Sequence, residues 1–230
     1  MALADDLKSE VAHIFGDQWS KRDGTVVPES EDLKLGNDAV ELEGAVLYAD
    51  LTASTALVDA YKPHFPAEVY KAFLHCAAKI IRSEGGVITA YDGDRIMGVF
   101  IGGSKNTNAA KCALRINWTR VNVINPALKA QYPKAPYDVK HVAGVDTSRL
   151  FVTRTGVRGA NDLVWVGRAA NYAAKLTELT GDYASWITAE VYDAMKEEAK
   201  TSNGRSMWEA RKWTAMNDRS IYRSNWTWKP

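Results

Sequence analysis

The sequence predicts an α+β protein in which helices pack on one face of a mostly antiparallel sheet. Residues 45–49 form a continuous run of small and apolar side chains, which is typical of a buried central strand. Residues 86–100 contain an Asp-Gly pair between two apolar segments, a pattern that favours a tight antiparallel hairpin. Strand-like and helix-like segments then follow one another in an order that is typical of a layered α+β fold.

Composition and charge exclude several functional classes. The 230 residues are 46% hydrophobic and 25% charged, and a net charge of +1 provides no broad basic field for nucleic acid. No apolar run reaches the roughly 18 residues of a membrane span, and the N-terminus carries acids where a secretory signal carries bases. Two cysteines, Cys76 and Cys112, fit a reduced protein. We therefore expect a cytoplasmic protein that binds neither nucleic acid nor membrane.

The N-terminal segment differs in character from the rest of the chain. Apolar residues recur at helical spacing over residues 4–19, whereas residues 24–37 are polar and contain a proline and two glycines. We expect a helix and connector over residues 1–38 and a main domain over residues 39–230, which includes the Trp-rich tail. The arm is interpreted as a packing appendage or dimer contact without chemistry of its own.

Two helices are predicted after the first strand of the main domain. Ser54 or Thr55 is expected to cap a helix that runs through Leu57 and Tyr61, because hydroxyl side chains accept hydrogen bonds from free N–H groups at a helix start. A second helix is expected over residues 67–83, where apolar side chains share one face and two glycines follow. The hairpin comes next.

In that hairpin, Asp92 and Gly93 are predicted to form the two-residue turn. Asp94 would then be the first residue of the returning strand. Since this strand is expected to pair beside residues 45–49, Asp94 should lie close to Asp50, which directly follows the first strand.

The second half of the domain is predicted to alternate between helices and strands. In chain order we expect a helix at 108–122, a loop at 125–136, a strand pair at 138–146 and 150–155 turned at 147–148, a glycine-containing loop at 156–161, an alanine-rich helix at 167–179, a strand at 186–188, a helix at 189–199 and a final strand at 221–223. The alanines should let the 167–179 helix lie close to a neighbour. Tryptophans in the tail are expected to pack, not to stack on bases.

Asp50 and Asp94 are the strongest candidates for chemistry. A carboxylate just past a buried strand is costly unless it is paired, hydrogen-bonded or bound to metal. Two carboxylates on adjacent strand ends can hold one or two divalent cations, and Mg²⁺ favours a few carboxylates completed by phosphate oxygens and water. Residues 51–55 lead into a helix N-terminus, which favours phosphate. The pattern predicts phosphoryl or nucleotidyl chemistry, although each aspartate taken singly reads as a helix cap or a turn residue.

These segments resemble the motifs of the class III nucleotide cyclases. Residues 48–55 (Tyr-Ala-Asp-Leu-Thr-Ala-Ser-Thr) resemble their first metal motif, and residues 92–97 (Asp-Gly-Asp-Arg-Ile-Met) resemble the second. Residues 144–147 resemble the strand that follows the third helix, and residues 164–176 resemble the segment that carries the transition-state asparagine and a basic residue. The resemblance extends over residues 44–190, and the motifs are specific as an ordered set.

The resemblance implies a ferredoxin-like cyclase fold that forms a homodimer with two active sites across its interface. It implies cyclisation of a nucleoside triphosphate with release of pyrophosphate, and two Mg²⁺ or Mn²⁺ ions held by Asp50, the Leu51 carbonyl and Asp94. Asn171 would orient the ribose, and Lys175 would meet charge that grows on the phosphate. Further substrate contacts would come from Tyr48, Thr52, Ala53, Ser54, Thr55, Tyr91 and Trp165.

Departures from the family pattern narrow the expected substrate. Lys175 stands where the family usually has arginine, so the charge is kept and the bidentate fork is lost. Ala90 and Val164 stand where adenylyl cyclases place the lysine and aspartate that read the base, so adenine lacks its usual partners. Tyr91 would instead shrink the base pocket. In these features the chain resembles the bacterial pyrimidine cyclases of the Pycsar anti-phage systems, which make cyclic UMP or cyclic CMP for a separately encoded effector.

Several alternatives stay open at this level. Asn171 also reads as a polar interface residue, Tyr91 as a sheet-packing aromatic and Trp165 as a packing residue. The basic residue that binds pyrophosphate has no clear match near Lys140 and His141; the alternatives in the tail are Arg205, Arg211 and Lys212. The substrate is UTP or CTP. The competing functions are an adenylyl cyclase with unusual base contacts and a non-catalytic cyclase-like module that only binds nucleotide.

Overall fold

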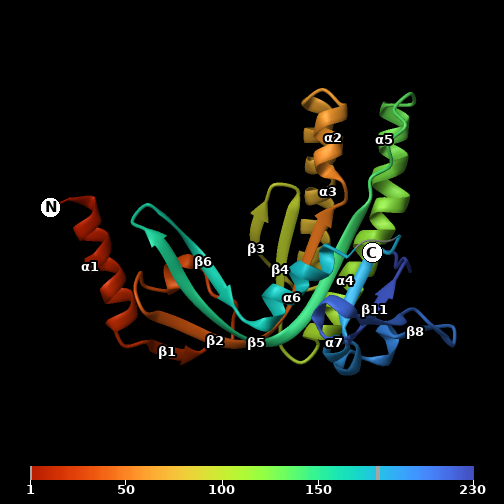
Figure 1. The fold of residues 1–230 in the computed structure, drawn as a ribbon. Helices are drawn as coiled ribbons and strands as arrows, with labels where there is room; N and C mark the ends of the chain where they lie inside the picture. Colours follow the sequence, from red (N-terminus) through yellow and green to blue (C-terminus); the bar gives the residue numbers. More distant parts are fainter. Residues whose placement is uncertain (1, 180–181) are drawn as a thin grey trace.

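A mixed sheet of nine strands is the centre of the computed structural model, which describes residues 2–179 and 182–230. Its main path runs β10-β11-β7-β5-β2-β4-β3, with β1 paired to β2 and β6 paired to β5 (Figure 1). The strands are β1 (Ser20–Asp23), β2 (Asp38–Leu51), β3 (Val87–Asp92), β4 (Arg95–Ile101), β5 (His141–Val157), β6 (Ala160–Val166), β7 (Ser185–Thr188), β10 (Glu209–Trp213) and β11 (Arg219–Ser224). A separate small pair consists of β8 (Thr201–Ser202) and β9 (Arg205–Ser206).

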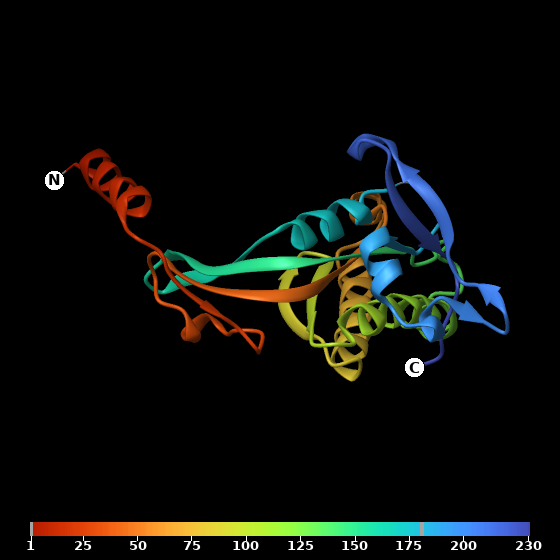
Figure 2. The same cartoon turned by 90° about the horizontal axis from the view of Figure 1, so that it is seen from below.

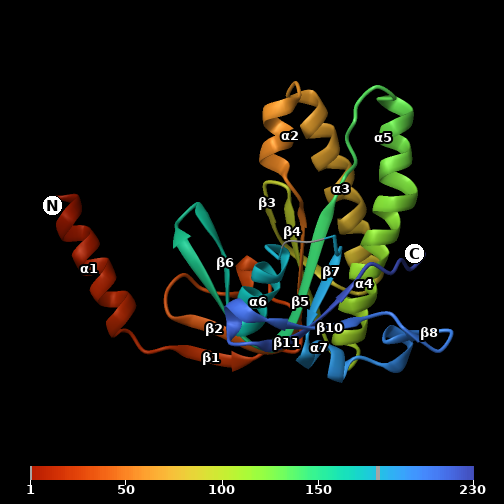
Figure 3. The same ribbon diagram turned by 45° about the vertical axis from the view of Figure 1, so that its right-hand side comes forward.

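Helices cover both faces of this sheet. They are α1 (Leu3–Gly16), α2 (Ser54–Ala60), α3 (His64–Ser83), α4 (Lys105–Thr119), α5 (Asn125–Gln131), α6 (Arg168–Thr177) and α7 (Ala189–Ala194), with short 3₁₀ segments at Ser30–Asp32, Glu197–Ala199 and Thr214–Met216. The columns formed by α2–α3 and α4–α5 rise beside one another on one side of the sheet (Figure 3). Among the described residues, no helix combines the length and the apolar character needed to cross a membrane.

Side chains of β2 alternate between two cores, as expected of a strand buried on both sides. Ala45, Leu47 and Ala49 pack in the larger core with α3 and α4. Val46 and Leu42 pack in the other core with the alanines of α6. The predicted buried central strand is confirmed, but the strand is longer than the predicted five residues.

The position of α6 corrects the prediction that helices lie on one face only. This helix lies on the face opposite α3 and α4 and packs tightly against β5. A side chain at Gly144 of β5 would come within 2.2 Å of the Ala173 carbonyl oxygen. Glycine on the strand and alanine on the helix therefore permit this close approach, as the small residues of the segment predicted.

The expected strand pair over residues 138–155 is wrong, because β5 is a single strand. It runs beside β2 without interruption, from the pair Ala39 and Thr153 to the pair Leu51 and His141. Thr147 and its neighbour Ser148, which look like turn residues in the sequence, lie inside the strand. The Thr147 hydroxyl donates to the Gly44 carbonyl, a partner 103 positions away along the chain.

Two predicted loops also belong to regular elements. Residues 156–161 turn directly from β5 into β6, with Gly159 at a φ of 85°, so β6 was missed. Residues 125–131 form α5, which continues from α4 through the π-helical segment Arg120–Ile124. Pro126 is tolerated because it directly follows the π-helical segment, where the regular i→i−4 hydrogen-bond pattern is already interrupted.

An arm projects from the body of the protein (Figure 2). It consists of β1, the first half of β2, the second half of β5, and β6, with α1 at its tip. The N-terminal helix was predicted correctly, and none of its described side chains is buried. Its last turn is fastened to the arm by the Asn37 amide, which donates to the carbonyls of Ile14 and Asp17 at 3.0 and 2.7 Å.

Candidate active site

Asp50 lies near the end of the central strand β2, between β4 and β5. Its Cα partners are Arg95 on β4 and Val142 on β5. Burial raises the pKa of the Asp50 carboxyl to about 6, and the neighbouring charge of Asp94 acts in the same direction, while Arg95 opposes both. The carboxylate therefore sits in a place that disfavours its charge unless a cation compensates.

Asp94 belongs to the turn between β3 and β4. The last pair of the hairpin is Asp92 with Arg95, so the two turn residues are Gly93 and Asp94. Gly93 has a φ of 60°, which is the conformation that a two-residue turn with glycine in its first central position requires. The prediction that Asp94 starts the returning strand was therefore wrong by one residue.

The carboxylate pair fits a divalent cation. Oδ2 of Asp94 is buried and has no hydrogen-bond partner among the described residues. Leu51 buries its side chain in the core, so only its backbone carbonyl is available to a ligand. The described residues contain no cluster of three or more His, Cys, Asp or Glu side chains. A cation here would therefore need phosphate or water oxygens to complete its shell, which is the arrangement that Mg²⁺ favours.

The turn after Asp50 is built differently from the prediction. The residue before α2 is Ala53, in a left-handed conformation with φ 58° and ψ 36°, and neither Ser54 nor Thr55 caps the helix. A non-glycine residue in this region costs about 1 kcal/mol, a kind of strain that occurs often at functional sites. The Thr52 N–H donates to the Lys140 carbonyl at 3.0 Å, which leaves residues 53–55 as the part of the turn that can approach a phosphate.

A cavity of about 370 Å³ adjoins this turn. Its lining comprises Thr52, Arg120, Lys140, His141, Val142, Asp182, Tyr183, Ala184 and Asn225. Burial, followed by the charge of Arg120, lowers the pKa of His141 to about 3, so the imidazole is neutral near pH 7. The positive charge of the cavity therefore comes from Arg120 and Lys140.

The basic residues of the tail do not line this cavity. Arg211 pairs with Glu209, and Lys212 donates to the Ser220 hydroxyl, all within the hairpin of β10 and β11. Arg205 lies in the small β8–β9 pair. Of the basic candidates, Lys140 is the one in the neighbourhood of Thr52.

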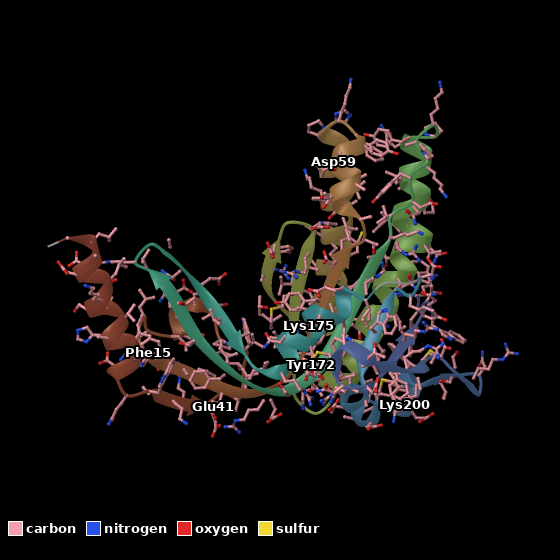
Figure 4. The ribbon with its side chains drawn as sticks, in the orientation of Figure 1. Phe15, Glu41, Asp59, Tyr172, Lys175 and Lys200 are labelled. Atoms are coloured by element: carbon pink, nitrogen blue, oxygen red, sulfur yellow. The ribbon has the colours of Figure 1, made fainter. Side chains whose placement is uncertain are left out.

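Asn171 and Lys175 are exposed and lie one turn apart on α6. Figure 4 labels Lys175. Within the described residues, neither side chain makes a hydrogen bond or ion pair with Asp50 or Asp94. The exposed face of α6 thus carries these two polar groups, and the structure does not connect them to the carboxylate pair of the same chain.

An ion network that sequence reasoning missed holds the start of α6. Arg168 contacts both carboxylate oxygens of Asp146 at 3.0 and 3.3 Å, and its third hydrogen bond reaches the Thr147 carbonyl at 2.6 Å. Glu190 accepts from Arg168 at 2.8 Å and also pairs with Arg219. The sequence does contain a signal for this network, because an aspartate inside an apolar strand, such as Asp146, requires a buried partner.

The aromatic candidates lie in three different environments. Tyr48 is half-buried, with the Arg95 guanidinium 5.2 Å from its ring centroid. Tyr91 is exposed on the outer strand β3, close to the Asp94 turn. Trp165 is buried in the core beneath α6. Its cross-strand partner Val152 is ten residues along β5 from Val142, which corresponds to about 30 Å of strand.

The structure therefore gathers some of the predicted site residues and separates others. Asp50, Asp94 and the 51–55 turn lie at one end of the sheet together with Tyr48 and Tyr91. Trp165 lies far from this group within one chain, and α6 presents its polar residues separately.

Comparisons with known proteins identify full-length relatives. The chain is 53% identical to a uridylate cyclase of Xanthomonas perforans, over 100% of this chain and 99% of that protein. It is 51% identical to a uridylate cyclase of Burkholderia cepacia, with 99% of each chain covered. No family model matches the chain.

Solved structures with the same fold are also nucleotide cyclases. The adenylyl cyclase CyaB of P. aeruginosa superposes with a TM-score of 0.68 over 81% of this chain and 95% of that chain, at 18% identity. The guanylyl cyclase Cya2 has a TM-score of 0.69 over 83% and 95%, at 17% identity. At these identities the likeness concerns the fold alone.

Proposed function

Because the chain belongs to the uridylate cyclases, a group within the class III nucleotide cyclases, we propose that it converts UTP into 3′,5′-cyclic UMP and pyrophosphate. The observation that carries this proposal is the identity above 50% to uridylate cyclases over the entire chain. The α+β cyclase fold and the carboxylate pair at the end of β2 support it. The product would act as a messenger for a separately encoded effector, as in the anti-phage systems that the sequence resembles.

In this proposal Asp50, Asp94 and the Leu51 carbonyl hold two divalent cations, Mg²⁺ or Mn²⁺. Such cations lower the pKa of the ribose 3′-hydroxyl and offset the charge of the triphosphate. The buried oxygen of Asp94 and the raised pKa of Asp50 both support a cation here. Asp50 has its pKa near 6, so its ligand form dominates at neutral pH.

The triphosphate would lie along the turn after β2. Residues 53–55 would offer backbone N–H groups, and Lys140 and Arg120 would supply positive charge from the adjoining cavity. The backbone bond between Thr52 and Lys140 supports this role, because it brings Lys140 next to the turn. Lys140 would then be the pyrophosphate-binding residue that no sequence motif identifies.

Asn171 and Lys175 would act from the partner subunit of a homodimer. Their exposure on α6 and their separation from Asp50 support an active site that two chains complete together. Lys175 would stabilise negative charge on the phosphate in the transition state, and Asn171 would orient the ribose. Trp165 would also reach a substrate only across the interface, since it lies far along β5 in its own chain.

The base would be selected without the pair that adenylyl cyclases use. Ala90 and Val164 offer no hydrogen bonds, and Tyr91 is exposed at the edge of the site, where it would limit the space for a larger purine. Tyr48 lies on the opposite face of the sheet, because it pairs with Met97 whereas Tyr91 pairs with Ile96.

A turnover panel tests the proposed function. Purified protein would be incubated with Mn²⁺ and one of UTP, CTP, ATP or GTP, and the products identified by mass. We expect cyclic UMP, with no activity in Asp50→Ala. Cyclic CMP as the main product would change the assigned substrate from UTP to CTP, and cyclic AMP would contradict the pyrimidine assignment. Nucleotide binding without any product would favour the non-catalytic module.

A further inference from the structure

Three aspartates are neighbours of one arginine, in the sheet or along the chain, at the candidate metal site. Arg95 starts β4 and lies opposite Asp50 on one side and opposite Asp92 on the other. Asp94 is its immediate neighbour in the chain. Residues opposite one another on paired strands have their Cβ atoms about 5 Å apart, so the carboxylates of Asp50 and Asp92 are both within reach of the long arginine side chain.

The arginine pairs with the carboxylate that is not a candidate metal ligand. Its Nη2 donates to Oδ2 of Asp92 at 2.7 Å, and its guanidinium lies over the Tyr48 ring, 5.2 Å from the centroid. Within the described residues, no ion pair joins Arg95 to Asp50 or Asp94. The buried Oδ2 of Asp94 is left without any partner instead.

This choice of partner matters because the guanidinium and a divalent cation compete for the same oxygens. Arginine is always charged and binds carboxylates through a planar fork, so a contact with Asp50 or Asp94 would occupy lone pairs that a metal requires. When the guanidinium lies over Tyr48, its charge still partly offsets the nearby negative charge, but it does not occupy the carboxylate oxygens of Asp50 and Asp94.

We propose that Asp92 is a positioning residue, which holds Arg95 on the Tyr48 ring and so keeps Asp50 and Asp94 open to divalent cations. The inference rests on the proposed function, and it assigns to the hairpin a task beyond turning the chain. Asp92 touches neither substrate nor metal in this account and acts only through the arginine.

A purely structural role for the pair predicts different behaviour. The Asp92 side chain is 74% exposed and the Arg95 side chain 30%, and such ion pairs contribute little to stability. If the Asp92–Arg95 pair only stabilised the hairpin, loss of Arg95 would weaken Mn²⁺ binding as much as loss of Asp92. If Asp92 restrains Arg95, a variant that lacks both side chains should not show the weaker Mn²⁺ binding expected when Asp92 alone is lost.

Mn²⁺ binding tests the inference without reference to turnover. Free Mn²⁺ would be titrated against each protein without nucleotide and followed by electron paramagnetic resonance. We expect D92N to bind Mn²⁺ about tenfold more weakly than wild type, which corresponds to about 1.4 kcal/mol. R95Q should bind at least as tightly as wild type, because a competing positive charge is gone. The double variant D92N/R95Q should match R95Q.

Controls separate this effect from other causes. Asp59→Asn removes the same charge from the exposed face of α2 (Figure 4) and should leave Mn²⁺ affinity unchanged. Thermal unfolding would verify that every variant is folded. Equal affinity in wild type and D92N, or a double variant as weak as D92N, would overturn the inference while the proposed function stands. A wild type without Asp50-dependent Mn²⁺ binding would overturn the inference together with the metal site.

Discussion

The two ends of the β2–β5 ribbon use charge in opposite ways. At the arm end, charged side chains are paired with one another: Arg22 with Asp38 at 3.0 Å, and Arg149 with Glu41 and Asp23 at 3.0 and 2.8 Å (Figure 4 labels Glu41 in this region). At the site end, Asp50 and Asp94 lie together, and a carboxylate oxygen lacks a partner.

The contrast is the one expected if the Asp50 end binds a ligand and the arm end only maintains the structure. Both ends belong to the same pair of strands in one continuous register, so neither backbone geometry nor strand propensity distinguishes them. Unpaired polar atoms in a buried position cost stability, and a fold retains them where a ligand completes the interaction.

The largest effect is expected from Asp50→Asn at the site end. Because the amide keeps the shape but cannot bind a divalent cation as a carboxylate does, cyclic UMP formation should fall by about 1,000-fold or more. The midpoint of thermal unfolding in EDTA should stay the same or rise, since a disfavoured buried charge has been removed. A large loss of both activity and stability would mean that Asp50 has a structural role.

The Arg168 network pairs a buried charge near the middle of the ribbon, where Asp146 lies opposite Val46, and Arg168→Met tests it. The substitution leaves the fully buried Asp146 with the Thr188 hydroxyl but without its cationic partner, so we expect a destabilisation of about 2–4 kcal/mol in chemical denaturation. Since burial raises the pKa of Asp146, the loss should be smaller at acidic pH, where the carboxyl can protonate. A loss below 1 kcal/mol would show that the network contributes little to holding α6.

A dimer with two complementary defects tests whether both chains build each site. One subunit would carry Asp50→Asn and the other Lys175→Ala, with the heterodimer purified through two tags. If each site takes Asp50 from one chain and Lys175 from the other, one of two sites is intact and about half of wild-type activity should return. Activity no greater than that of the two single-variant homodimers would place both residues of a site in one chain.

The raised pKa of Asp50 should make the stability of the protein depend on pH. The pKa of Asp50 rises from 3.8 in the unfolded chain to about 6 in the folded one, so the folded protein binds the proton more tightly. Between about pH 4 and 6, wild type should therefore lose stability relative to Asp50→Asn as the pH rises, and the difference should level off above that range. Unfolding midpoints in EDTA at pH 4.5 and 7 measure this. A constant difference would contradict it.

The smallest effect is expected at the arm end. Arg149→Met removes the contacts with Glu41 and Asp23, and since the arginine is exposed, the midpoint of thermal unfolding should hardly change. Turnover of UTP should stay near the wild-type value. A loss of activity comparable with that of Lys175→Ala would indicate that the arm takes part in the site.

Much of the fold followed from patterns that neighbouring residues create. Apolar spacing predicted α1, α3 and α6, and the Asp-Gly pair placed the β3–β4 hairpin within one residue. The carboxylates at 50 and 94 were recognisable because each follows or interrupts an apolar strand. Their ligand roles, like those of Asn171 and Lys175, stay predictions.

Other features could not be predicted from the sequence, because the interactions that cause them join residues far apart in the chain. The polar pair at 147–148 looked like a turn, and only hydrogen bonds to β2 and to α6 make it part of a strand. Likewise, the proline at 126 signalled a loop, although a π-helical turn carries the helix past it.

Local sequence is enough to show which residue types stand beside a buried strand, and hence where charge must find a partner. Which partner each charge has depends on the folded chain. Arg95 lies between Asp50 and Asp92 and pairs with Asp92, and Arg168 pairs with Asp146, which is 22 positions away in the chain. Local propensity acts over a few neighbouring residues, whereas these pairings depend on strand register and close packing, which exist only once the sheet and α6 are assembled.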